Sequence, residues 1–278
     1  MARTGQGKGF DRQFFYEVFP DVEPAFGGAL DTPSLARGPE ILLRAVAELG
    51  LAPDSRAVDV GCGTGEHAFA LATLYGFRVL GLDPVQRHLD LARAARREQA
   101  DPIAARVSFE RGTAAHVPVH DGDVDLIWCH DVLPHVDDAA VALREFARVL
   151  RPGGYVVAHQ VLAAPSFSGD DADWLVEQRG MVRAGLDPAT HDRAVADSGL
   201  LVVDSIDLGS EWDERAEVES GQVSRAMLRV ARMRRDPDRW RAEFGAPAFD
   251  AMLATSMWQV HRLLGDLPGR LDVLVKPS

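Results

Sequence analysis

The stretch that decides the fold runs Val58-Asp59-Val60-Gly61-Cys62-Gly63-Thr64-Gly65. A short β-branched run leads into alternate glycines, and a helical pattern begins directly after them. Glycine takes up backbone angles that other residues avoid and lets a ligand approach the main chain closely. Ligands of open α/β sheets bind at the carboxyl ends of the strands. The stretch therefore predicts a strand-to-helix junction where a cofactor lies.

Further short apolar runs alternate with helical patterns on both sides of this junction. Strands are expected at 57–60, 79–83, 107–110, 124–129 and 155–158. Such alternation is typical of βαβ units, so we predict an α/β fold with a doubly wound, mostly parallel sheet. Pro84 stands at a first-turn position and opens a helix to about residue 99, while Asp137 or Asp138 can cap the helix before residue 150. Further strands are expected near Leu200 and at 271–275.

The residues around the glycines narrow the choice of cofactor. Asp83 ends the second strand about twenty residues beyond the loop, as expected of a carboxylate that holds ribose hydroxyls. A dinucleotide site would need a third glycine where the chain has Glu66, and no Gly-Lys-Ser/Thr of a P-loop follows. The pattern favours a cofactor with a ribose and a positive charge but no phosphate. S-adenosylmethionine is such a molecule.

Four motifs in register resemble those of class I S-adenosylmethionine-dependent methyltransferases, in their small-molecule, natural-product branch. They are the glycine loop 59–65, the acidic motif 81–83, the strand 124–128 and the turn 150–154. The resemblance covers roughly residues 40 to 160. It implies a seven-stranded, Rossmann-like sheet whose last strand runs antiparallel.

The resemblance also implies a cofactor site for S-adenosylmethionine and its product S-adenosylhomocysteine. The glycines would pass beneath the methionine portion, Asp83 would hold the ribose and Pro84 would lie against the adenine. Thr113 and Ala114 stand where many members have an Asp, which leaves a backbone or hydroxyl contact to the adenine as the alternative. The full set of expected cofactor residues is Asp59, Gly61, Cys62, Gly63, Gly65, Asp83, Pro84, Thr113, Ala114 and His130.

Methyl transfer mainly requires alignment of the acceptor and exclusion of water, and it needs a base only if the acceptor must lose a proton. Histidine titrates near neutrality and is the natural candidate. His130 follows the fourth strand, His135 precedes the next helix and His159 ends the fifth strand. For each of them a packed, structural role is the alternative. For His130, a cofactor contact through the backbone is another.

Aromatic residues outside the core are the candidates for binding the substrate. Phe15, Tyr16, Trp174 and Trp212 would line an apolar lid over a hydrophobic acceptor. We expect residues 1–37 to form an N-terminal helical lid segment and 38–278 a methyltransferase domain with insertions at about 164–187 and 210–264. Alternatively, the inserted helices pack on the sheet or on a second subunit. In the second case the protein would be a homodimer.

Composition narrows the class of partner. A net charge of −12 argues against nucleic acid, whose binding rests on Lys and Arg. No apolar run approaches the roughly 20 residues of a membrane span, and residues 1–10 do not resemble a secretory signal, so a cytoplasmic protein is expected. Cys62 and Cys129 do not form a CxxC motif. No metal site is predicted, since solvation explains the acidic groups at 170–173 and 211–214 better than a divalent cation does.

The sequence therefore predicts an enzyme that transfers a methyl group to a small molecule. The acceptor atom is expected to be oxygen first, then carbon or nitrogen. Two other classes of function stay open. One is a non-catalytic scaffold that keeps the cofactor fold, and the other is a cyclase or decarboxylase on the same fold.

Overall fold

The computed structural model describes residues 17–31 and 36–278, in two compact units that divide after Leu35. The first unit contributes helix α2 (Phe19–Leu30), none of whose residues is buried. Its exposed apolar side chains Val22, Phe26 and Leu30 recur every four residues and so share one face. Phe15 and Tyr16, expected to bind the substrate, lie outside the described residues, so their role stays a prediction.

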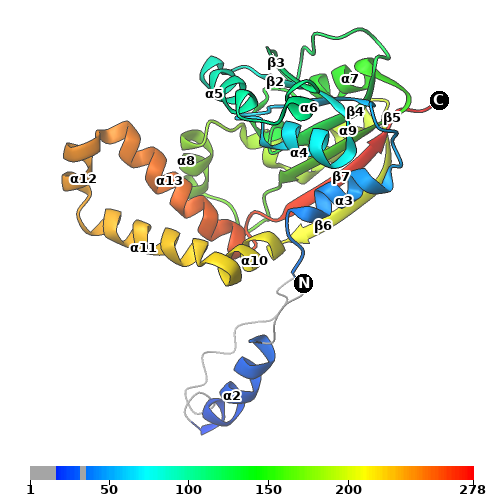
Figure 1. Cartoon of the computed structure of the whole chain (residues 1–278). Coiled ribbons are helices and arrows are strands. Elements are labelled where there is room, and N and C mark those ends of the chain that lie inside the picture. Colours follow the sequence, from blue (N-terminus) through cyan, green and yellow to red (C-terminus); the bar gives the residue numbers. More distant parts are fainter. Residues whose placement is uncertain (1–16, 32–35) are drawn as a thin grey trace. The chain divides into compact units, whose positions relative to one another are not determined.

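The second unit is built on a seven-stranded sheet of order β3-β2-β1-β4-β5-β7-β6 (Figure 1). Strands β1 to β5 are parallel, and β7 runs antiparallel to both β5 and β6. The strand order reverses between β1 and β4, so the carboxyl ends there form the crevice that binds ligands in such sheets. The predicted doubly wound, seven-stranded fold is confirmed. The strands are β1 (Arg56–Val60), β2 (Arg78–Asp83), β3 (Val107–Arg111), β4 (Val124–His130), β5 (Leu150–Val161), β6 (Leu201–Gly209) and β7 (Gly269–Val275).

Helices cover both faces of this sheet, because successive side chains along a strand point to opposite sides. On β4, Leu126 packs in one buried cluster with α3, α4 and α5, while its neighbour Ile127 packs in another with α7 and α9. Asp138 caps α7 by accepting hydrogen bonds from the Ala140 and Val141 N–H groups, as predicted. The helices on the two faces are α3 (Glu40–Glu48), α4 (Glu66–Tyr75), α5 (Gln86–Arg97), α7 (Ala139–Val149) and α9 (Pro188–Ala196). The short α6 (Asp101–Ala104) lies between α5 and β3 in the chain.

The remaining helices stand beside the carboxyl ends of the strands. The segment 164–187 forms α8 (Asp170–Gln178), and the segment 210–264 forms α10 (Glu211–Ser220), α11 (Gln222–Arg235), α12 (Pro237–Phe244) and α13 (Ala246–Leu263). Helices α11 and α13 pair in a hairpin that projects from the sheet, with α12 at its tip (Figure 1). Leu175 of α8 and Trp258 of α13 share a third buried cluster. No helix among the described residues is long and apolar enough to cross a membrane.

Candidate active site

The glycine loop leaves β1 in a conformation that suits glycine alone. Gly61, Gly63 and Gly65 have φ values of +69°, +53° and +90°. A Cβ on Gly61 would collide with the side chain of Val132, and a Cβ on Gly65 would collide with Phe109. The loop therefore needs glycine at these two positions for both its backbone angles and its close packing.

Asp83, at the end of β2, holds this loop. Its Oδ2 accepts a hydrogen bond from the Gly63 N–H at 3.0 Å, and its Oδ1 accepts one from the Val85 N–H at 2.8 Å. The carboxylate lies 3.2 Å from His88 Nδ1 and the residue is 4% exposed. A carboxylate offers about four lone-pair sites, so Asp83 retains capacity for ligand hydroxyls.

A cavity of about 470 Å³ opens beside the loop. Gly61, Pro84, Thr113, Ala114 and His135 line it, together with Val60, Gly112, Ala115, Val132, Val136, Asp137, Asp138 and Val141. Its volume is that of an ordinary small-molecule site. The other expected cofactor residues do not belong to this lining: Asp59 and Cys62 are buried behind the loop, and Gly63, Gly65, Asp83 and His130 also lie outside it. Burial raises the pKa of Asp59 to about 8. Its carboxyl accepts a hydrogen bond from the Ala68 N–H in the first turn of α4, so Asp59 connects β1 to the helix that follows the loop.

The carboxyl ends of β4 and β5 bring His130 and His159 side by side, since the two residues pair in register. Their rings stack at 4.9 Å between centroids, and Trp212 of α10 stacks on His159 at 4.1 Å. Asp131 directly follows His130 with φ +55°, an angle that few residues other than glycine adopt. Its Oδ1 lies 3.3 Å from His159 Nδ1, and its Oδ2 lies 4.0 Å from Arg262 Nη1. A constrained backbone thus holds a carboxylate between an imidazole and a guanidinium.

The protonation states in this cluster follow from burial and charge. Burial lowers the pKa of His130 to about 4, so the imidazole is neutral at neutral pH and can accept a proton. Burial by itself would raise the pKa of Asp131, but His159, His130 and Arg262 together hold it below its ordinary value. The site therefore places a neutral imidazole beside an ionised carboxylate.

In this region the carboxylates that could bind a metal ion already face cationic side chains of the chain. Ligand atoms of His130, Asp131 and His159 lie within 4.8 Å of one another and could hold an ion. Arg262, however, already faces Asp131 as a cation. The acidic groups that the sequence singled out also meet cations of the chain: Asp173 lies 3.6 Å from Arg183, Glu211 bonds Arg37, and Asp213 bonds Arg262.

A second cavity, of about 290 Å³, lies beside the histidine cluster and is called the acceptor cavity below. Its lining residues are Pro39, Asp131, His135, Val161, Arg179, Met181, Trp212, Asp213, Ala216, Gln222, Thr255, Trp258, Gln259 and Arg262. His135 lines both this cavity and the one beside the glycine loop. Its Nδ1 lies 3.0 Å from the Gly180 carbonyl, so we assign the proton to Nδ1, which leaves Nε2 as an acceptor. The two cavities therefore meet at His135.

Trp212 thus lines the acceptor cavity, whereas Trp174 packs partly buried against the α8 and α13 cluster and lines neither cavity. Trp258, which the sequence offers beside Trp174 and Trp212 as an aromatic residue of the insertions, also lines the acceptor cavity. Sequence reasoning missed Arg179 and Arg262 as residues of this site, because nothing in the local sequence separates the two arginines from surface residues.

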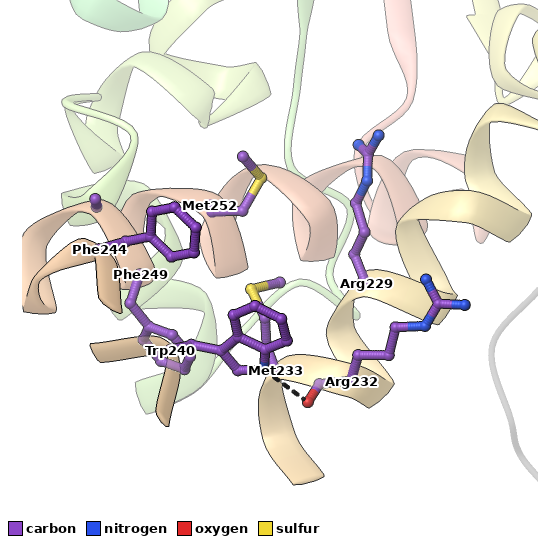
Figure 2. A pocket seen from close by; sticks show the side chains of 8 residues that line it. Arg229, Arg232, Met233, Trp240, Phe244, Phe249 and Met252 are labelled. Atoms are coloured by element: carbon purple, nitrogen blue, oxygen red, sulfur yellow. Dashed lines mark hydrogen bonds between the residues drawn. The ribbon is translucent and has the colours of Figure 1, made fainter. Parts of the chain in front are cut away.

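A third cavity, of about 370 Å³, lies on the helical hairpin. Figure 2 shows the side chains of Met233, Trp240, Phe249 and Met252 along it, with Arg229 and Arg232 beside them. Trp240 Nε1 donates a hydrogen bond to the Arg232 carbonyl at 3.2 Å. None of its lining residues belongs to the other two cavities.

Comparison with known sequences places residues 58–158 in the methyltransferase domain family. The 27-O-demethylrifamycin SV methyltransferase of Amycolatopsis mediterranei (strain S699) is 35% identical over 130 residues, 47% of each chain. The O-methyltransferase rstn1 of Aspergillus nomiae is 30% identical over 161 residues, 51% of this chain and 71% of that protein. The S-adenosyl-L-methionine-dependent Diels-Alderase iccD of Talaromyces variabilis is 31% identical over 192 residues, 66% and 61% of the two chains. The chain thus spans about half the length of the rifamycin relative.

Solved structures share the fold at lower identity. Phosphoethanolamine N-methyltransferase 2 of Haemonchus contortus, solved with S-adenosylhomocysteine, has a TM-score of 0.66 at 19% identity over 87% of this chain and 54% of that one. The [4+2]-cyclase SpnF has a TM-score of 0.64 at 21% identity over 99% and 100%. At these identities the likeness shows the fold alone.

Proposed function

Because the chain belongs to the class I S-adenosylmethionine-dependent methyltransferases, we propose that it methylates an oxygen of a hydrophobic, natural-product-type small molecule. One observation supports this above the others: His135 lines both the cavity at the glycine loop and a second cavity beside half-buried His130. A transferase needs this arrangement, with a donor and an acceptor that meet away from bulk water.

S-adenosylmethionine would occupy the cavity at the glycine loop and supply an activated methyl group on a positively charged sulfur. Asp83 would accept hydrogen bonds from its ribose hydroxyls, and Gly61 would let the methionine portion lie against the backbone. Pro84, Thr113 and Ala114 would border the adenine, as their place in the cavity lining allows. Among the described residues no lysine or arginine side chain lines this cavity, which agrees with a cofactor that lacks phosphate.

His130 is our first candidate for the base that takes a proton from an acceptor hydroxyl. It is neutral because of its burial, and the ionised Asp131 beside it would stabilise the imidazolium that forms. His135, with Nε2 free, is the second candidate, and His159, stacked between His130 and Trp212, is the third. Trp212 and Trp258 would exclude water around the acceptor.

The preference for oxygen rests on relatives that are named as O-methyltransferases. A second function has its own support, because the relative that matches 66% of this chain at 31% identity is named a Diels-Alderase. A cyclase of this kind would need the acceptor cavity but would release no S-adenosylhomocysteine.

Calorimetric titration with S-adenosylmethionine, and separately with NADH, tests the cofactor. We expect binding of S-adenosylmethionine alone, followed by S-adenosylhomocysteine release when hydroxylated aromatic and polyketide acceptors are screened. Binding of the cofactor with turnover of an acceptor but no S-adenosylhomocysteine would favour the cyclase. Binding of neither cofactor by the folded protein would refute the proposal and favour a scaffold.

A further inference from the structure

In the part of the chain that the structure describes, the acceptor cavity contains a guanidinium with no carboxylate at ion-pair distance. The side chain of Arg179, the residue after α8, makes one long hydrogen bond to the described residues, 3.4 Å from Nη1 to Thr255 Oγ1. Its Nε is buried and has no partner among those residues. Burial lowers the pKa of this guanidinium, yet arginine stays charged in proteins. A desolvated, unpaired cation is costly, so its place in a cavity points to a ligand.

The acids nearby are already engaged by other groups. Asp213 accepts a hydrogen bond from Arg262 Nε at 2.9 Å. Asp131 lies between His159 Nδ1 and Arg262 Nη1. Arg262 is therefore matched by two carboxylates, whereas Arg179 is the cation of the cavity that still lacks a partner at ion-pair distance in the part of the chain that the structure describes.

Arg179 is also held in place. Its guanidinium lies 5.5 Å from the ring centroid of Trp258, in a cation–π contact. The next residue, Gly180, offers its carbonyl to His135 Nδ1 at 3.0 Å, and the Val182 N–H donates to the Pro134 carbonyl at 2.8 Å. These two hydrogen bonds tie the segment after Arg179 to the turn that borders the cofactor cavity. A group bound to Arg179 would thus be held in register with the cofactor.

We propose that Arg179 binds a carboxylate, or a similar planar oxyanion, of the acceptor molecule and so selects amphiphilic acidic substrates. The proposal rests on the methyl-transfer function above, whose acceptor it specifies. Guanidinium and carboxylate match as two parallel hydrogen bonds. Trp212 Nε1 belongs to a residue of the same lining, is buried and has no partner within residues 17–31 and 36–278, so it is a further donor. Val161, Met181 and Trp258 supply the apolar wall for the rest of the molecule.

Calorimetric binding of 2-naphthoate and of neutral 2-naphthamide to the full chain tests this assignment. The two probes share ring and size and differ in charge. We expect the wild-type protein to bind the naphthoate roughly tenfold more tightly or better, the range of a charge-assisted hydrogen bond. Arg179→Met should abolish the preference, and Arg179→Lys should keep only part of it, because ammonium is a point charge without the planar fork.

The control is Arg144→Met, which removes the same charge from an exposed position on α7 and should leave the preference intact. Equal affinity of the two probes for the wild-type protein, binding of neither, or a preference that survives in a folded Arg179→Met protein would overturn the proposal. Probe binding requires no turnover. A carboxylate preference without S-adenosylmethionine binding would therefore refute methyl transfer alone, and cofactor binding without the preference would refute the role of Arg179 alone.

Discussion

Replacing Gly61 by alanine tests whether the glycine loop is fixed by packing as well as by backbone angle. Gly61 has φ +69°, and an alanine there has to adopt a left-handed conformation that costs roughly 1–2 kcal/mol. The new Cβ also collides with Val132, a half-buried residue in the loop after β4. Overpacking of this kind costs about 1–3 kcal/mol. We expect Gly61→Ala to lower the free energy of unfolding by about 2–5 kcal/mol.

Gly122→Ala is the matched control. Gly122 has nearly the same φ, +70°, but a Cβ there meets nothing within 4 Å. It should therefore show only the backbone part of the loss, about 1–2 kcal/mol. Equilibrium unfolding in urea, without any ligand, measures both variants and the double variant Gly61→Ala/Val132→Ala. Removal of the Val132 methyl groups should recover most of the steric part. Equal losses in the two glycine variants, or no recovery in the double variant, would refute the packing argument.

Three further predictions concern single side chains. Asp83→Ala should keep the fold but weaken S-adenosylmethionine binding by roughly tenfold or more, the scale of lost charge-assisted hydrogen bonds. Calorimetry measures this affinity, and an unchanged value would show that Asp83 does not hold the cofactor. His130→Ala should slow methyl transfer by about 10²–10⁴-fold. Because burial lowers the pKa of His130 to about 4, wild-type activity should be level above that pH and fall as the pH drops through it, whereas a midpoint near 6.5 would contradict this assignment. Asp59 has a folded-state pKa raised to about 8, so the folded protein retains a proton that the unfolded chain releases above about pH 4. The unfolding free energy of the wild-type protein relative to Asp59→Asn should thus decline between pH 5 and pH 8, and a rise would show that Asp59 is ionised when folded.

The cofactor half of the site was predictable because its signals are local. The glycines, the strand before them and Asp83 lie within about two dozen residues, and parallel strands bring their carboxyl ends to one edge. The same rule anticipated that His130 and His159, at the ends of neighbouring strands, would lie together. Their stacking could not be predicted, because Trp212, which stacks on His159, comes from a distant segment, and the left-handed φ of Asp131 has no signal in the local sequence.

The acceptor half depends on contacts between distant residues. Arg262 and Asp213 are 49 positions apart, and Arg179 and Thr255 are 76 apart. Helical periodicity gives each helix a buried face but does not say which helices meet. Trp174 and Trp258 therefore looked equivalent as aromatic residues of insertions, although only Trp258 lines the cavity. The apolar run near Leu200 predicted a strand there, and β6 continues beyond that run to Gly209. Asp204, Ser205 and Asp207 interrupt the apolar pattern, which an exposed edge strand permits.

The residues of the cofactor site and most residues of the acceptor cavity lie in different parts of the sequence. The region 58–158 that matches the methyltransferase domain contains the glycine loop, Asp83 and His130. Arg179, Trp212 and Arg262 lie outside it, in the inserted segments. The two halves meet at His135, at the pair Asp131–Arg262 and at the hydrogen bonds that link Gly180 and Val182 to the turn after β4. Substitutions on α8, α10 and α13 can therefore reshape the acceptor cavity while the strands that hold the cofactor stay unchanged. We accordingly expect exchange of Arg179 to alter which acceptor is bound far more than it alters the affinity for S-adenosylmethionine.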